Sequence, residues 1–242
     1  MSDSSAVEPD GAPPADDASK SVARKGIWVG MATGAYGISY GALAVAAGLS
    51  FWQAVALSLL LFSGGSQFAL VGVIGAGGSG ASAVGTSTLL GLRNGFYGLQ
   101  VSKLLQVTGW RRAAAAHLTI DESTAVTITQ PNRTLARIGF WWTGLSVFVL
   151  WGAMSAVGAA LGNAMGDPAR YGLDAAAPAA FCALVWSRLR TRRAQFVAVA
   201  AGLIALAVAP YTASGIPVLI AALAAVVAGF LPDRSVTSAE EI

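Results

Sequence analysis

The chain contains 242 residues, of which 55% are hydrophobic and only 11% are charged, and its formal net charge is +3. Soluble domains carry roughly 25% charged residues, so this composition excludes an ordinary soluble protein. It predicts a polytopic, all-α helical bundle in the lipid bilayer of the cell (inner) membrane. The basic residues lie mostly in loops between apolar segments and give no reason to expect nucleic-acid binding. The single cysteine, Cys182, excludes an internal disulfide and a thiolate metal site.

The first 25 residues differ from the rest of the chain. They are rich in Ser, Ala, Pro and Asp, and they lack the basic start and early apolar core of a signal peptide. We therefore predict a disordered acidic tail over residues 1–25, a transmembrane domain over 26–232 and a short cytoplasmic tail over 233–242.

Glycine, proline and charged residues divide the transmembrane domain into seven apolar segments. Their lengths predict about seven full membrane spans, although the last is short. The segments cover about residues 27–49, 51–75, 83–105, 138–165, 171–186, 194–210 and 216–231.

The distribution of basic residues requires a further, partial pass. Arginine and lysine favour the cytoplasmic side, which places Arg24, Arg133 and the arginine cluster at 188–193 inside. Three spans alone cannot return the chain to the cytoplasm before Arg133. The segment 117–129 is too polar to face lipid but can line a protein interior, so we interpret it as a partial or re-entrant pass, with both termini inside. A wholly cytoplasmic amphipathic helix is the alternative.

Two segments share a weak pattern that hints at an inverted repeat. Tyr36–Leu49 and Tyr171–Leu184 both begin with Tyr-Gly-aliphatic and share the spacing of small residues. Inverted repeats with discontinuous helices and a central substrate site are a recurrent plan of secondary transporters. A chance match in Gly- and Ala-rich sequence would look similar.

Arg93 is the only Asp, Glu, Lys or Arg residue between residues 26 and 102. A charge at membrane depth costs several kcal/mol unless it is paired or hydrated, so we expect Arg93 to face an acidic partner. Asp121 and Glu122 are the favoured partners, and Asp174 is a further candidate. Two adjacent carboxylates cannot both ionise cheaply in a poorly solvated place, so one should take up a proton readily. That behaviour would suit a proton-coupled carrier.

The alternative for this region is purely structural. Arg93 would extend to the membrane interface, and Asp121 would cap the helix that begins there. The glycines near Arg93, at positions 91, 95 and 98, are interpreted as room for a neighbour or for water. His117, the only histidine, is either a proton relay or an interfacial residue.

The stretch Phe62–Phe68, FSGGSQF, places small polar residues in the middle of an apolar span. Glycine pairs weaken a helix, and unwound backbone at membrane depth must line a cavity or lie within protein, so we predict a broken helix beside a substrate site. A weaker pattern of the same kind covers Gly34–Gly41. Close helix packing over small residues is the alternative. The predicted substrate-binding residues are Tyr36, Ser39, Tyr40, Ser63, Gly64, Gly65, Ser66, Gln67, Asn94 and Tyr97.

Five motifs in order resemble those of the AzlC family, the large subunits of prokaryotic branched-chain amino acid exporters. The resemblance extends over about Ile27–Leu231. Its motifs are Phe62–Phe68, Leu92–Gly98, Asp121–Thr124, Gly172–Ala179 and Pro217–Ala222. One departure concerns Arg93-Asn94-Gly95, because the family's form here is Asn-Leu-Arg-His and the histidine is missing.

The resemblance implies a carrier that exports valine, leucine, isoleucine or methionine with the proton-motive force. It also implies a separately encoded small membrane subunit of the AzlD type. No Cys/His metal spacing, phosphate-binding loop or catalytic acid–histidine pair occurs, so we expect no cofactor and no enzyme activity. An integral membrane enzyme and a passive channel are the alternatives, and the Asp121-Glu122 region alone offers acids for an enzyme.

Overall fold

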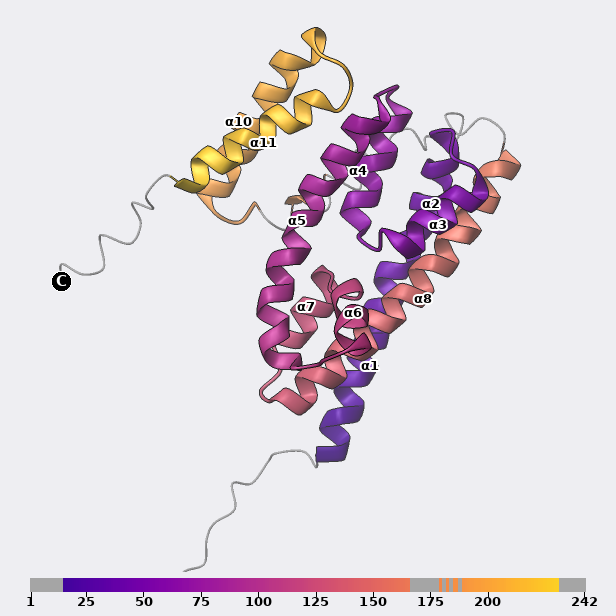
Figure 1. Ribbon diagram of the computed structural model, residues 1–242, viewed down its shortest axis with the longest axis vertical. Helices are drawn as coiled ribbons and strands as arrows, with labels where there is room; N and C mark the ends of the chain where they lie inside the picture. Colours follow the sequence, from indigo (N-terminus) through magenta and orange to yellow (C-terminus); the bar gives the residue numbers. More distant parts are fainter. Residues whose placement is uncertain (1–14, 166–178, 180–181, 183–184, 187–188, 231–242) are drawn as a thin grey trace, which may run out of the picture.

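The computed structural model describes residues 15–165, 179, 182, 185–186 and 189–230, and all regular structure in these residues is helical (Figure 1). The all-α expectation is therefore confirmed for the described part of the chain. The helices are α1 (Ala15–Ala35), α2 (Gly37–Ala46), α3 (Phe51–Leu60), α4 (Gly64–Gly75), α5 (Gly80–Leu105), α6 (Trp110–His117), α7 (Asp121–Ile128), α8 (Arg133–Met165), α10 (Arg192–Val208), the short η3 (Ala209–Tyr211) and α11 (Ile216–Phe230).

Three helical stretches in the described residues are long and apolar enough to cross a membrane: Asp16–Ala46, Arg133–Ala164 and Arg192–Tyr211. They correspond to the first, fourth and sixth predicted spans, and several such helices indicate a multi-pass membrane protein. The second predicted span is divided into two shorter apolar helices, α3 and α4. The fifth, at 171–186, lies mostly outside the described residues, as does one half of the suggested inverted repeat.

Helix α1 begins earlier than the sequence predicts. It starts at Ala15, so the last eleven residues of the predicted disordered tail are helical. Asp16 and Asp17 lie in its first turn, where carboxylates interact favourably with the helix dipole. Asp16 also pairs with Lys20 at 3.6 Å, one turn along the exposed surface. The prediction of disorder was based on the composition of the whole segment and did not take these local helix-favouring residues into account.

Helices α1 and α2 pack along the whole length of α8 through glycine (Figure 1). A Cβ atom at Gly30 or Gly34 would overlap α8 side-chain atoms, and one at Gly41 would overlap the Ser155 backbone carbonyl. In return, a Cβ at Gly158 of α8 would overlap the Ile38 carbonyl. Close approach of backbones over small residues is the usual way in which membrane helices pack. Part of the glycine pattern predicted as substrate-lining therefore serves helix packing.

The second predicted span is broken, as expected, but the break is short. Ser50 and Gln53 form a capping box that starts α3, and α3 ends at Leu60. The chain is then irregular from Leu61 to Ser63, where Ser63 is extended (φ −160°, ψ 97°). The residues Gly64–Gln67 already form the first turn of α4. The interruption therefore lies just before the glycine pair.

The polar segment 117–129 is also interrupted. Helix α6 ends at His117, and α7 starts at Asp121 after a three-residue gap. On α7, Ser123 and Thr127 are fully buried, and the helix contacts α5 and α8. Helix α7 thus packs one polar face against the rest of the protein, while Ala125 and Ile128 on its other face are exposed.

The arginines at the start of α8 have a local role at the end of α5. Arg133 donates through Nη1 to Gln106 Oε1 at 2.8 Å, and Arg137 donates through Nε to the Leu105 carbonyl at 2.9 Å. Cations are favoured at the C-terminus of a helix, where the last carbonyls lack partners. The two arginines therefore stabilise the α5 end, whichever side of the membrane they occupy.

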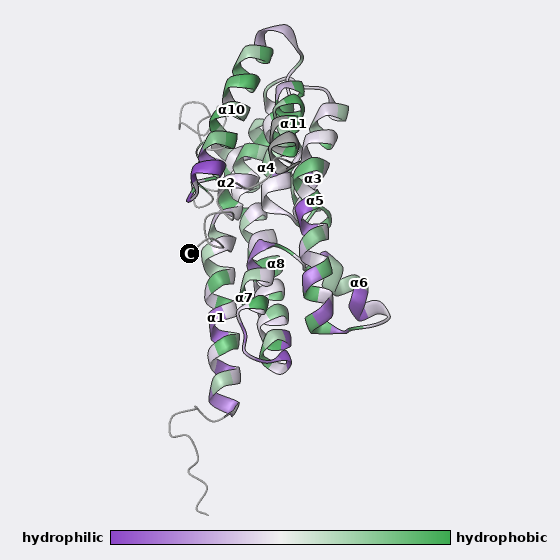
Figure 2. Cartoon of the chain, turned by 90° about the vertical axis from the view of Figure 1, so that its left-hand side faces the viewer, coloured by the Kyte–Doolittle hydropathy of each residue, from purple (hydrophilic) through white to green (hydrophobic). Residues whose placement is uncertain are grey.

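Helices α10 and α11 form a hairpin beside the rest of the molecule (Figure 1). Its turn is attached through Ser214, whose Oγ donates to the Ala76 carbonyl at 2.8 Å and whose carbonyl accepts from Ser82 Oγ at 3.1 Å. No residue of α10 is buried. Figure 2 shows hydrophobic residues along most of this helix, with hydrophilic residues on α6 and at the N-terminal end of α1.

Candidate functional site

A cavity of about 210 Å³ lies where three helix interruptions meet. These are the α1–α2 junction at Tyr36, the α3–α4 break and the α6–α7 break. Helices α5 and α8 complete the walls. The lining residues are Thr33, Tyr36, Phe62, Ser63, Gly64, Gly65, Phe68, Arg93, Asn94, Ile120, Asp121, Glu122, Val147 and Trp151.

Two helices begin at this cavity, α4 at Gly64 and α7 at Asp121. The first backbone N–H groups of a helix have no partner within the helix, and the helix dipole makes that end electropositive. Ser63 does not cap α4 with its side chain, and its Oγ donates to Ser66 Oγ at 3.1 Å. The amides at Gly64 and Gly65 also carry no side chain that would shield them. This end of α4 is suited to an anion.

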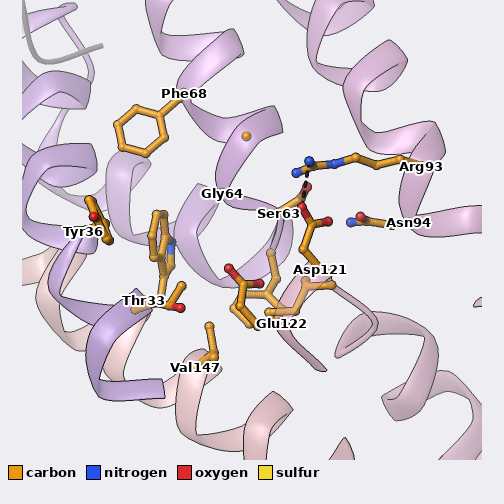
Figure 3. Close-up of a pocket in the computed structure, with 14 residues that line it drawn as sticks. Thr33, Tyr36, Ser63, Gly64, Phe68, Arg93, Asn94, Asp121, Glu122 and Val147 are labelled. Atoms are coloured by element: carbon orange, nitrogen blue, oxygen red, sulfur yellow. Dashed lines mark ion pairs between the residues drawn. The ribbon is translucent and has the colours of Figure 1, made fainter. Parts of the chain in front are cut away.

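Arg93 of α5 and Asp121 of α7 form an ion pair across the cavity wall (Figure 3). Arg93 Nη1 lies 2.9 Å from Asp121 Oδ2, and the side chains are 34% and 24% exposed. A Cβ built on Gly65 would lie only 2.9 Å from Arg93 Nη2, so the guanidinium rests directly against the first turn of α4. The pairing favours the interpretation of Arg93 as a partnered charge over an extended interfacial anchor.

The glycine that admits the guanidinium is not one of those next to it in sequence. A Cβ at Gly95 or Gly98 would meet nothing within 4 Å, and one at Gly91 would meet Ser66 Oγ at an ordinary contact distance of 3.4 Å. The approach depends on Gly65, which lies on another helix. The sequence analysis did not identify Gly65 as the glycine that meets the guanidinium.

Glu122 occupies a different part of the cavity from Asp121. Its side chain lies beside Thr33 of α1 in Figure 3. The two adjacent acids therefore have different neighbours: Asp121 pairs with a cation on α5, and Glu122 lies beside Thr33 of α1. The site holds one cation and two carboxylates within a small volume, with α4 beginning beside them.

The remaining walls are apolar and aromatic. Phe62, Phe68, Val147 and Trp151 line the cavity, and Trp151 is only 4% exposed. A Cβ at Gly64 would lie 3.3 Å from the outer edge of the Trp151 indole. The cavity thus has a charged side and an apolar side, and its volume is below the ~300–1,000 Å³ of typical drug-sized sites. These properties fit a small amphiphilic solute.

The structure brings together about half of the sequence-predicted binding residues. Tyr36, Ser63, Gly64, Gly65 and Asn94 line the cavity together with Arg93, Asp121 and Glu122. The others do not line it: Ser39, Tyr40, Ser66, Gln67 and Tyr97. Asp174 lies outside the described residues.

The residues that do not line the cavity mostly support it. Tyr40 is fully buried, donates to the Ala54 carbonyl at 3.3 Å and stacks on Trp151. Gln67 is 1% exposed and binds protein groups with both ends of its amide. Both side chains point into the core, which the polar composition of their motifs did not indicate.

Sequence reasoning missed several apolar lining residues. Ile120 directly precedes the predicted acids, and Phe62 and Phe68 flank the small polar motif, so adjacency could have identified them. Trp151 carries a different signal: it lies in the middle of a long apolar span, whereas tryptophan concentrates at span ends. Thr33 and Val147 carry no such signal.

His117 connects the two broken helices. Its Nε2 lies 2.9 Å from the Leu59 carbonyl in the last turn of α3, and its ring contacts Phe62 and Phe148. The histidine thus holds the end of α6 against the end of α3, next to the cavity wall. In the described residues, no group of three His, Cys, Asp or Glu side chains could hold a metal ion.

A comparison with protein families gives one match. The model of the AzlC protein family matches residues 29–165, more than half of the chain. The chain has no significant match among curated proteins or among solved structures. The matched residues contain every residue that lines the cavity. The chain therefore belongs to the AzlC family, a family of branched-chain amino acid transporters.

Proposed function

We propose that the chain is the large subunit of a secondary carrier that exports valine, leucine, isoleucine and methionine, driven by the proton-motive force. The observation that carries this proposal is the convergence of three helix interruptions on one small cavity with a charged and an apolar side. Discontinuous helices that meet at a central site are characteristic of secondary transporters.

The cavity offers a partner for each part of an apolar amino acid. The carboxylate would bind the free amides of Gly64 and Gly65, close to the Arg93 guanidinium. The ammonium would bind near Glu122. The aliphatic side chain would then lie against Phe62 and Trp151, where its burial is favourable by roughly 25 cal/mol per Å² of apolar surface.

Proton coupling would use the three charged groups of the site. The Arg93–Asp121 pair joins α5 to α7 at 2.9 Å, and Glu122 directly follows Asp121 in the sequence. Protonation of Glu122 would remove the charge that attracts the substrate ammonium and leave the Arg93–Asp121 pair intact. The affinity of the site would therefore depend on the proton, which is the requirement for coupled export.

The partner in this proposal is a small membrane subunit of the AzlD type. A large apolar surface is available to such a partner, since α10 has no buried residue, and α10 and α11 contact the rest mainly through the α4–α5 end. We expect the two subunits to be required together for export.

Efflux from preloaded cells tests the proposal. Cells that co-express the chain and the small subunit are loaded with a valine- or methionine-containing dipeptide, and the internal amino acid is followed. We expect a lower internal concentration than in cells with either subunit alone, and an uncoupler should abolish the difference. Unchanged efflux in the presence of both subunits would contradict the proposal.

A passive channel is the remaining alternative mechanism. A channel would release the amino acid only down its gradient, and an uncoupler would not prevent that release. The measurement therefore includes an external concentration equal to the internal one: continued net efflux identifies a carrier, and none identifies a channel.

A further inference from the structure

Gln67 joins the broken helix α3–α4 to α8 through a set of buried hydrogen bonds. Its Nε2 donates to the carbonyls of Leu57 at 3.0 Å and Ser58 at 3.3 Å, near the end of α3. Its Oε1 accepts from the indole Nε1 of Trp151 at 2.8 Å. Both amide protons and the carbonyl oxygen of the side chain are therefore used, which leaves little capacity for a substrate.

Trp151, in contrast, reaches the cavity itself. Its ring forms a three-membered aromatic cluster with Tyr40, with centroids 6.0 Å apart and planes at 25°, and with Phe68, with centroids 6.2 Å apart and planes at 83°. The outer edge of the indole lies over Gly64, the first residue of α4. These ring contacts set the plane of the indole, and the bond to Gln67 sets which edge faces the break.

We infer that Gln67 is a positioning residue that holds the Trp151 indole as the wall that selects the substrate's side chain. The inference rests on the proposed function and extends it to the selection of substrate. A pocket discriminates between apolar side chains of different size only if the residues of its wall keep their position when a larger side chain enters. The contacts with Tyr40 and Phe68 resist tilting of the indole, and the hydrogen bond to Gln67 resists its rotation away from the cavity. Loss of this bond would also leave the buried indole N–H without an acceptor, which costs free energy.

The test compares variants from both sides of this hydrogen bond. Gln67→Met retains the approximate shape of the side chain and removes all its hydrogen bonds, whereas Trp151→Phe retains a ring and removes both the bond to Gln67 and the outer edge of the indole over Gly64. Gln67→Glu, in its neutral form, can still accept from the indole and donate to a carbonyl. Trp141→Phe, on the same helix but outside the cavity, is the matched control for the loss of an indole.

The readout is substrate preference in cells that express both subunits. Leucine- and phenylalanine-containing dipeptides are loaded to equal internal concentrations, and the ratio of leucine to phenylalanine export is measured for equal amounts of membrane-inserted protein. We expect the ratio to fall about fivefold or more in Gln67→Met and Trp151→Phe, since one hydrogen bond is worth about 1 kcal/mol. The double variant should fall no further than either single variant. Gln67→Glu and Trp141→Phe should keep the wild-type ratio.

The outcomes separate this inference from the proposed function. If the wild type exports neither amino acid, the proposed function is wrong. If the wild type exports leucine and Gln67→Met keeps its ratio, Trp151 is not positioned by Gln67 and the inference is overturned. Should Gln67→Met fail to accumulate, Gln67→Asn is measured in its place, because the shorter amide cannot reach both α3 and Trp151; an unchanged ratio there overturns the inference equally.

Discussion

The guanidinium of Arg93 and the carboxylate of Asp121 are 2.9 Å apart, although 27 residues and an interrupted helix separate them in the chain. We expect Arg93→Ala to lower export about tenfold or more, because hydrogen bonds between charged groups are worth about 1.5–3 kcal/mol. Efflux from preloaded cells, normalised to inserted protein, measures the effect. The exchanged pair Arg93→Asp with Asp121→Arg should recover part of the activity that either single change removes. Wild-type efflux in Arg93→Ala would show that the pair has no role in transport.

Gly65 provides the space in which the Arg93 guanidinium lies. A Cβ there would be 2.9 Å from Nη2, so we expect Gly65→Ala to displace the guanidinium and to lower export severalfold while the protein still inserts. Gly72→Ala is the matched control on the same helix, since a Cβ at Gly72 meets nothing within 4 Å. That change should leave export unchanged and stabilise α4 by about 0.5–1 kcal/mol. Equal export by the two variants would contradict the role of Gly65.

Glu122 is the acid of the site that faces α1 instead of Arg93. We expect Glu122→Gln to lose the response of export to a proton gradient, because the neutral amide cannot exchange a proton. Proteoliposomes with an imposed pH difference measure this response directly. Asp16→Asn, which changes an exposed acid far from the cavity, should keep it. A Glu122→Gln variant that still follows the gradient would place the coupling elsewhere.

The backbone contact between α2 and α8 predicts a defect in stability. A Cβ at Gly41 would overlap the Ser155 carbonyl, and overpacking of this kind costs roughly 1–3 kcal/mol. We expect Gly41→Ala to lower the thermal transition of the purified protein by several degrees and to reduce the amount in the membrane. Gly202→Ala on α10, where a Cβ meets nothing within 4 Å, should be at least as stable as the wild type.

The polar anomalies of the sequence located the centre of the site. Arg93 stood alone in an apolar region, and few acids outside the tails could pair with it, so charge balance was enough to suggest Asp121. The small residues around Ser63 weakened a helix at a depth where unwound backbone must face protein. Both arguments depend on the cost of burying charge and backbone in lipid, and they apply without knowledge of the packing.

These arguments could not predict which motif residues line the cavity and which are buried in the core. Composition does not determine which face of a helix a side chain takes, so Tyr40 and Gln67 were grouped with Tyr36 and Ser63 as binding residues. In the structure the first pair turns into the core. Trp151 lies 84 positions from Gln67, and no local pattern connects two residues at that distance. Tertiary packing alone assigns them their partners.

Among the residues that the structure describes, those around the cavity extend from Thr33 to Trp151 and precede the end of α8, and the hairpin of α10 and α11 contributes none of them. If this cavity binds the substrate, we expect the hairpin to tolerate divergence without a change in substrate recognition, provided that the Ser214 attachment is kept. Homologues that share the first 165 residues could be recombined with foreign hairpins, and the chimaeras would keep their substrate while they exchange whatever the hairpin touches in the bilayer.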